Sequence, residues 1–471
     1  MSRRYPTRQA VVVIHGIGEQ KPMQTLRSFV NEIVTTTNTF GQKLWNQPDR
    51  MSDSFELRKF TAPGDRKDWP RTDYFEYYWA ANMRDTKYSH VLTWFVGLLF
   101  KRPWDIPARI RLIWWGSWGL AAFAVLAAAM GWIAPPGSGG VAPASWTAAV
   151  LAALVAAILN GAFLGFIGDA ARYLSPNPDN IAQRQAIRSD GVRLIRQLHA
   201  CGKYGRIIVV GHSLGSVIAY DILRFIWDEY RESSRIEYPG ARDEILDEMR
   251  ALMSEGPGGD LKAFALRYQD AQERLWRAER EHGGTWLVTD LVTCGSPLAH
   301  AAVLLASSPL DLAERQRERE LPMCPPRTQD REDAFTYGVP DTEDGDPETA
   351  ATRIIHNSAL FACTRWSNLY FESDFIAGPL AEVFGPGIRD IRVETEDKGA
   401  KDRRWNLRYA LGKTWASHTM YWQPPKPAWW NRSAPPMTWD SIRRLRGAMQ
   451  VNDMVRVTFP ATKRNDAGTD D

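Results

Sequence analysis

Short apolar segments alternate with helical patterns along most of the chain. Residues 11–14 are β-branched and are followed by a glycine turn, which is typical of a buried strand. This alternation favours a mostly parallel sheet covered by helices on both faces, so we predict an α/β fold. The further strands that the pattern predicts cover residues 55–60, 74–79, 207–210, 286–293 and 366–371.

Two longer apolar stretches break this alternation. Residues 112–134 and 145–167 carry no formal charge, and each is long enough to cross roughly 30 Å of hydrocarbon as a helix. Lys101 and Arg102 precede the first stretch and Arg172 follows the second, which places both ends in the cytoplasm by the positive-inside rule. We therefore expect a two-helix transmembrane hairpin, here in a bacterial inner membrane; a pair of buried core helices is the alternative.

Charge and cysteine content narrow the classes of partner and compartment. The formal net charge of +3 arises from 58 basic and 55 acidic side chains spread along the chain, so no nucleic-acid partner is expected. Four cysteines lack both metal-ligand spacing and the density of a disulfide scaffold, which favours a reducing compartment. No metal ion or organic cofactor is expected.

A candidate nucleophile lies between a predicted strand and a predicted helix. Residues 206–216 read RIIVVGHSLGS, and apolar positions then recur at helical spacing. Gly211, Ser213 and Gly215 match G-x-S-x-G, in which the glycines permit a sharp turn that projects the serine hydroxyl above the sheet. We predict that Ser213 is catalytic; an inert serine in a tight turn is the alternative.

GHSLG in this setting resembles the lipase and serine-esterase branch of the α/β-hydrolase superfamily, and the HGIG sequence of residues 15–18 strengthens the likeness. The resemblance implies an α/β-hydrolase fold. It also implies that the backbone N–H groups of Ile17 and Leu214 form the oxyanion hole, with Gly16 and Gly18 freeing the backbone of the early loop.

A serine nucleophile needs a histidine base and a carboxylate that orients it. In this family the acid follows the serine and the histidine follows the acid. Of eight histidines only His418, in TWASHTMYW, lies beyond the preferred acid Asp374. Asp374 follows the strand-like RWSNLYF in a stretch that resembles the W-x-N…D-x-I segment of lipase-like proteins, and Glu372 is the alternative acid.

These assignments divide the chain into five segments. They are the N-terminal part of the hydrolase domain with the oxyanion loop (1–100), the transmembrane hairpin (101–172), the nucleophile-bearing part (173–230), a charged helical insertion (231–284) and the C-terminal part with acid and histidine (285–471).

The expected function is that of a membrane-anchored serine hydrolase that cleaves a carboxylic ester through an acyl-enzyme. Because the anchor would hold the site near a lipid bilayer, we expect a lipid or lipid-linked ester as substrate. The residues leave open a catalytically silent membrane scaffold, and a thioesterase or acyltransferase that uses the same three side chains.

Overall fold

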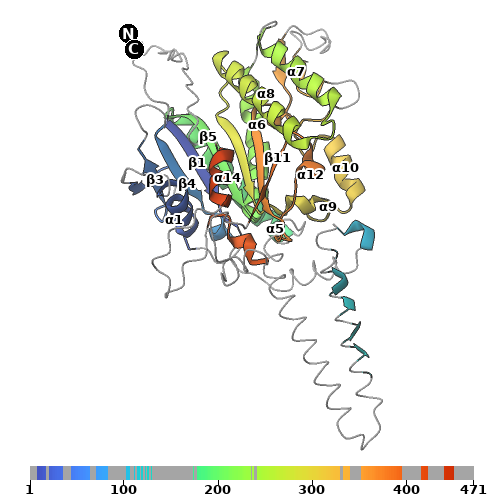
Figure 1. Cartoon of the computed structure of the whole chain (residues 1–471). Helices are drawn as coiled ribbons and strands as arrows, with labels where there is room; N and C mark the ends of the chain where they lie inside the picture. Colours follow the sequence, from blue (N-terminus) through green and yellow to red (C-terminus); the bar gives the residue numbers. More distant parts are fainter. Residues whose placement is uncertain are drawn as a thin grey trace, which may run out of the picture.

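The fold was analysed in a computed structural model of the chain (Figure 1). The structure describes residues 8–16, 21–35, 44–52, 54–63, 70–82, 102–106, separate positions within 111–129, residue 173, and residues 178–234, 236–237, 241–328, 333–339, 352–394, 415–422 and 440–449.

An eight-stranded mixed sheet forms the centre of the described structure. Its order is β11-β10-β7-β5-β1-β4-β3-β2, and every pairing from β11 to β4 is parallel, whereas β3 and β2 join antiparallel. The prediction of an α/β fold with a mostly parallel sheet is therefore confirmed. The strands are β1 (Arg8–Ile14), β2 (Trp45–Pro48), β3 (Arg58–Ala62), β4 (Thr72–Tyr77), β5 (Tyr204–His212), β7 (Val288–Cys294), β10 (Arg365–Phe371) and β11 (Arg389–Val393).

Helices cover both faces of this sheet (Figure 1). A second, three-stranded antiparallel sheet has the order β6-β9-β8, with β6 (Ile236–Glu237), β8 (Thr336–Val339) and β9 (Thr352–Ile355). The α-helices are α1 (Gln24–Val30), α5 (Pro178–Ala200), α6 (Leu214–Arg231), α7 (Ala241–Glu255), α8 (Leu261–Glu281), α9 (Ala301–Leu304), α10 (Pro309–Arg317), α11 (Leu360–Cys363), α12 (Ala381–Phe384) and α14 (Asp440–Met449). The other helical segments are η1 (Asn31–Thr35), η2 (Ala80–Asn82), η3 (Pro103–Asp105), η4 (Glu232–Ser234), η5 (Pro297–His300) and η7 (Trp415–Thr419).

Each face of the sheet has its own hydrophobic core. Along β1, Ala10, Val12 and Ile14 belong to the core that contains α5, α6 and α8, whereas Val11 and Val13 belong to the core that contains α1 and α14. Successive strand side chains point to opposite faces, so a run of apolar residues fills both cores at once. This is why residues 11–14 show no polar alternation.

The predicted strands correspond to β1, β3, β4, β5, β7 and β10, with ends that differ by up to about three residues, as is usual for such boundaries. The charged segment 231–284 contains α7 and α8. Helix α8 packs directly on the sheet, because the amide of Gln269 donates to the carbonyl oxygen of Trp366 in β10 at 3.0 Å.

The predicted membrane location is wrong. Within the part of the chain that the structure describes, every helix falls short of the length or the hydrophobicity needed to span a bilayer. A spanning helix requires about 20 consecutive apolar helical residues. Only separate positions of the first predicted span, 112–134, are described, and the second predicted span, 145–167, lies outside the described residues.

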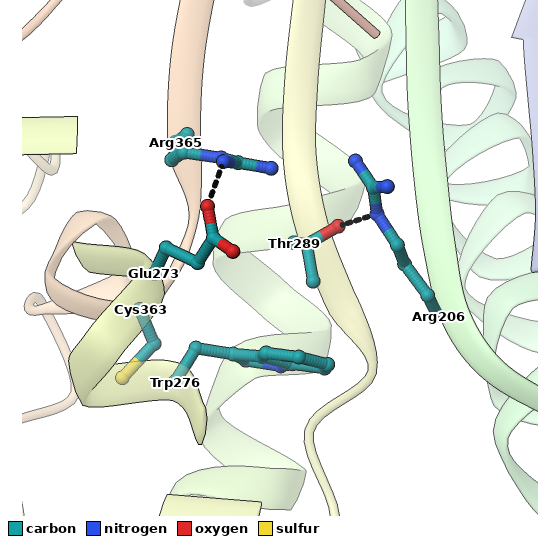
Figure 2. Close-up of a pocket in the computed structure, with 6 residues that line it drawn as sticks. All are labelled: Arg206, Glu273, Trp276, Thr289, Cys363 and Arg365. Carbon is teal, nitrogen blue, oxygen red and sulfur yellow. Dashed lines mark hydrogen bonds and ion pairs between the residues drawn. The ribbon is translucent and has the colours of Figure 1, made fainter. Parts of the chain in front are cut away.

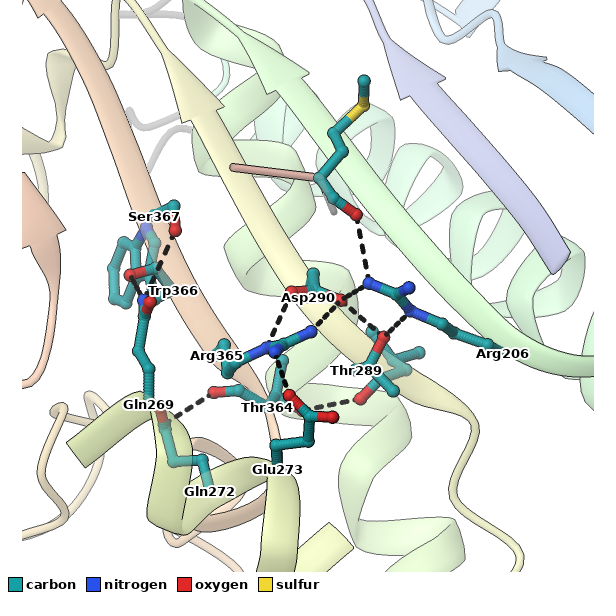
Figure 3. Close-up of polar contacts among 12 residues, drawn as sticks. Arg206, Gln269, Gln272, Glu273, Thr289, Asp290, Thr364, Arg365, Trp366 and Ser367 are labelled. Carbon is teal, nitrogen blue, oxygen red and sulfur yellow. Dashed lines mark hydrogen bonds and ion pairs between the residues drawn. The ribbon is translucent and has the colours of Figure 1, made fainter. Parts of the chain in front are cut away.

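A buried ionic network ties the amino ends of three central strands together (Figure 3). The guanidinium of Arg206 in β5 donates to Asp290 in β7 at 2.6 Å and to the main-chain oxygen of Met449 at 3.0 Å. Arg365 in β10 donates to the same Asp290 carboxylate at 2.9 Å. Because the two guanidiniums outweigh burial, the pKa of Asp290 lies below its usual value, and the network stays charged.

Candidate active site

Ser213 occupies a strained turn between β5 and α6. Its backbone has φ 53° and ψ −129°, in the positive-φ region that L-residues seldom adopt. Two hydrogen bonds hold the turn: the Ser213 N–H donates to Cys294 O at 2.9 Å, and the Ser216 N–H donates to Ser213 O at 2.9 Å. Strain of this kind costs about 1–3 kcal/mol and is concentrated at functional sites.

The glycines of the predicted motifs are required by close packing. A Cβ atom on Gly211 would lie 2.6 Å from the Cα atom of Ser216, and one on Gly215 would lie 2.3 Å from the carbonyl oxygen of Ile14. A Cβ atom on Gly16 would lie 2.7 Å from the Cβ atom of Ser213. The end of β1 therefore lies directly against the turn that carries Ser213, because Gly16 and Gly215 have no side chains to separate the two segments.

His418 and Asp374 are brought together from segments 44 residues apart. His418 lies in η7, Asp374 lies three residues after the end of β10, and their Nδ1 and Oδ2 atoms are 2.8 Å apart. Because a carboxylate can only accept, Nδ1 carries a proton toward Asp374, and Nε2 is the ring nitrogen left to act as a base.

The carboxylate of Asp374 is fully buried, and its ionised form is well supported. Its Oδ1 atom accepts from the Ile376 N–H at 3.1 Å, and its Oδ2 atom accepts from the Tyr421 hydroxyl at 3.0 Å as well as from His418. Burial alone would raise the pKa of Asp374, but the charge and hydrogen bond of His418, together with the other two donors, hold it below its usual value.

The turn after β7 links Ser213 to the His418–Asp374 pair. The Ser213 N–H is bonded to Cys294, the last residue of β7. A Cβ atom on the next residue, Gly295, would lie 3.1 Å from the Cε1 atom of His418. Ser213 and His418 are 1% and 7% exposed, so both side chains lie in a largely dehydrated environment, where electrostatic interactions are strong.

Of the remaining predicted site residues, the structure describes Leu214 and Glu372 but not Ile17 and Gly18. Leu214 is the first residue of α6, so its backbone N–H lies at the amino end of that helix, as the oxyanion prediction requires. Ile17 and Gly18 lie outside the described residues. The alternative acid Glu372 is about 59% exposed and forms an ion pair with Arg392, whereas Asp374 is the carboxylate bonded to His418.

Two further side chains at the site were missed by the sequence interpretation. His212 precedes the serine, and its Nε2 atom lies 2.8 Å from the main-chain oxygen of His418. Tyr421 follows His418 by three residues, and its hydroxyl reaches Asp374. Tyr421 lies two residues beyond the end of η7, so its closeness to His418 in the sequence was the only signal and the contact itself depends on the tertiary fold.

A pocket elsewhere in the molecule is unrelated to these residues. Figure 2 shows it lined by Arg206, Glu273, Trp276, Thr289, Cys363 and Arg365. It lies at the amino ends of β5, β7 and β10, about 20 Å along the strands from their carboxyl ends, where Ser213 and Asp374 lie. In the described part of the chain, no three histidine, cysteine, aspartate or glutamate side chains gather as a metal site would need.

Comparison of the chain with protein-family models, with curated proteins and with solved structures found no match. Function must therefore be inferred from the residues and geometry of the chain itself.

Proposed function

We propose that this protein is a serine hydrolase of the α/β-hydrolase superfamily that cleaves a carboxylic ester through an acyl-enzyme. The observation that carries the proposal is the buried 2.8 Å hydrogen bond between His418 and Asp374. His418 packs against the turn at Gly295, and the residue before that turn, Cys294, accepts the N–H of Ser213, which is held at positive φ. A buried carboxylate that orients a neutral histidine is the arrangement that activates a serine hydroxyl.

In the proposed reaction Ser213 Oγ attacks the acyl carbonyl carbon, and Nε2 of His418 takes the hydroxyl proton. Asp374 stabilises the imidazolium that forms. The backbone N–H groups of Leu214 and Ile17 would bind the oxyanion of the tetrahedral intermediate. The imidazolium then protonates the leaving alcohol, and a water molecule activated by His418 releases the acid and restores Ser213.

The proposed substrate class is broader than the sequence suggested. The preference for a lipid ester depended on the predicted membrane anchor, which is wrong. The proposal therefore names the carboxylic ester alone, and thioester hydrolysis and acyl transfer become outcomes of a substrate screen, since the same side chains support them.

Covalent labelling of the purified full-length protein by a fluorophosphonate tests the proposal. Intact mass should show one adduct on the wild type and none on Ser213→Ala or His418→Ala. Ser233→Ala removes an exposed serine hydroxyl in η4, just after α6, and is the matched control, which should label like the wild type. Absence of an adduct on wild-type protein with a cooperative thermal transition would overturn the proposal.

A further inference from the structure

Tyr421 makes two hydrogen bonds that close the turn carrying Asp374. Its hydroxyl oxygen accepts from the Phe371 N–H at 3.1 Å, and the hydroxyl lies 3.0 Å from Asp374 Oδ2. The Asp374 N–H in turn donates to Phe371 O at 3.2 Å. The hydroxyl therefore bridges the end of β10 and the carboxylate three residues later.

The direction of these bonds is fixed by the groups involved. A backbone N–H can only donate, so the Phe371 bond uses a lone pair of the Tyr421 oxygen, and the single hydroxyl proton is left for Asp374. Burial and the Asp374 charge raise the pKa of Tyr421 well above its usual value, so the hydroxyl stays protonated.

Packing leaves the ring of Tyr421 little freedom. The side chain is 1% exposed, and its centroid lies 4.9 Å from that of Phe371 and 5.7 Å from that of His212. A Cβ atom on Gly295 would lie 2.7 Å from its Cε2 atom. Since Gly295 lacks that atom, the ring packs directly against the turn that also contacts His418.

We propose that Tyr421 is a positioning residue that fixes the Asp374 carboxylate and, through it, the imidazole of His418. This inference rests on the proposed hydrolase function. The Tyr421 hydroxyl bonds the candidate acid Asp374, which in turn bonds the candidate base His418, so Tyr421 acts through these two side chains. Without its hydroxyl, Oδ2 would lose one of its two side-chain donors, and the carboxylate would be held by His418 and the Ile376 N–H alone.

The test compares Tyr421→Phe with Tyr220→Phe in the full-length protein. Tyr220 is also fully buried, and its hydroxyl donates to the Pro322 carbonyl at 2.9 Å from the other face of the sheet, so the control removes a comparable hydrogen bond away from the site. With a p-nitrophenyl ester as probe, Tyr421→Phe should lower kcat by about tenfold or more with KM nearly unchanged, because hydrogen bonds to charged groups are the strong ones.

The pH profile of kcat/KM separates positioning from a general loss of stability. The ionisable groups packed around the His418–Asp374 pair are Tyr421, His212 and, on β7, Cys294, with His15 behind His212. Burial raises the pKa of Cys294 and lowers that of His15 to about 4, and burial and His418 lower that of His212 to about 3. In Tyr421→Phe the Asp374 carboxylate loses a donor that offsets its negative charge next to His418. The acidic limb of the kcat/KM profile should therefore move to higher pH.

A proton NMR spectrum provides a readout that does not need activity. The Nδ1 proton of His418 should resonate downfield of the amides, disappear in His418→Asn, shift in Tyr421→Phe and stay in place in Tyr220→Phe. A wild type without labelling or turnover would overturn the hydrolase proposal, whereas an active wild type with the same kcat, acidic limb and resonance in Tyr421→Phe would overturn the role of Tyr421 alone.

Discussion

The Nε2 atom of His212 and the main-chain oxygen of His418 are 2.8 Å apart, so the residue before the candidate nucleophile is bonded to the candidate base. A carbonyl oxygen only accepts, which places a proton on Nε2 of His212. The His212 ring packs 5.1 Å from the His418 ring and 5.0 Å from that of Trp422. The turn that carries Ser213 and the η7 segment that carries His418 are thus joined by one neutral histidine, His212.

Replacement of His212 should separate these two segments. We expect His212→Phe to lower kcat for ester hydrolysis about tenfold, because it deletes one hydrogen bond that fixes the position of His418. His282→Phe, which removes a ring bonded to Ala278 O at the end of α8, is the control. Equal kcat values for the two variants would rule out a role for His212 in placing the base.

The identity of the acid can be decided by two amide substitutions. Asp374→Asn keeps the shape of the buried side chain but removes the charge that orients His418, so kcat should fall by at least about 100-fold. Glu372→Gln should leave kcat within about twofold of wild type, because its carboxylate faces Arg392 at the surface. Steady-state kinetics on both variants would reveal the reverse order if Glu372 were the acid.

The strain at Ser213 predicts that glycine at this position gives a more stable protein than alanine. Ser213→Gly and Ser213→Ala both lack the hydroxyl, but only glycine adopts φ 53° without steric cost. Urea unfolding should therefore show Ser213→Gly to be more stable than Ser213→Ala by about 1 kcal/mol, with both inactive. A lower stability for the glycine variant would show that the turn stores no strain.

Sequence patterns pointed to those parts of the candidate site that depend on local chemistry. Gly211, Ser213 and Gly215 lie within five residues, and the turn they form is set by their own backbone. The resemblance to the W-x-N…D-x-I segment led to Asp374, and the order of serine, acid and histidine then led to His418. Tyr421 and His212 were missed because their roles depend on tertiary packing that joins β5, β10 and η7.

The membrane prediction is wrong. An uncharged stretch of 23 residues meets the composition of a spanning helix, but no helix in the described part of the chain is long and apolar enough to cross a bilayer. The edge strands β2 and β11 escaped prediction as well. β2 is exposed along its whole length and begins with Trp45, so the alternation that reveals a half-buried strand is absent.

Gly215, which packs between α6 and β1, and Gly447, which is exposed in α14, should respond in opposite ways to replacement by alanine. At Gly215 the new Cβ would lie 2.3 Å from Ile14 O and 2.4 Å from His15 O, so Gly215→Ala should destabilise the fold by about 2 kcal/mol or more. Gly447 lies exposed within α14 with open space around it, so Gly447→Ala should stabilise by about 0.5–1 kcal/mol. Thermal unfolding that moved both midpoints the same way would contradict this account.

Glu76 gives the stability of the protein a specific pH dependence. The carboxylate of Glu76 is buried at the end of β4 and accepts from the Met23 N–H at 2.6 Å. Burial raises its pKa to about 7 despite that bond, above the value of 4.5 expected for the unfolded chain. Between these values the folded protein binds more protons than the unfolded chain, so the contribution of Glu76 is full below pH 4.5 and is lost as the pH rises through about 7.

Glu76→Gln removes this titration while keeping a side-chain oxygen that can accept from Met23. The unfolding free energy of the variant relative to wild type should therefore rise with pH, by up to about 1.4 kcal/mol per pH unit between pH 5 and 7. Urea unfolding at pH 5, 6, 7 and 8 measures the trend, with the exposed Glu372→Gln as control. A Glu76→Gln difference that stayed constant, or that fell as the pH rose, would mean that Glu76 is ionised in the folded protein throughout this range.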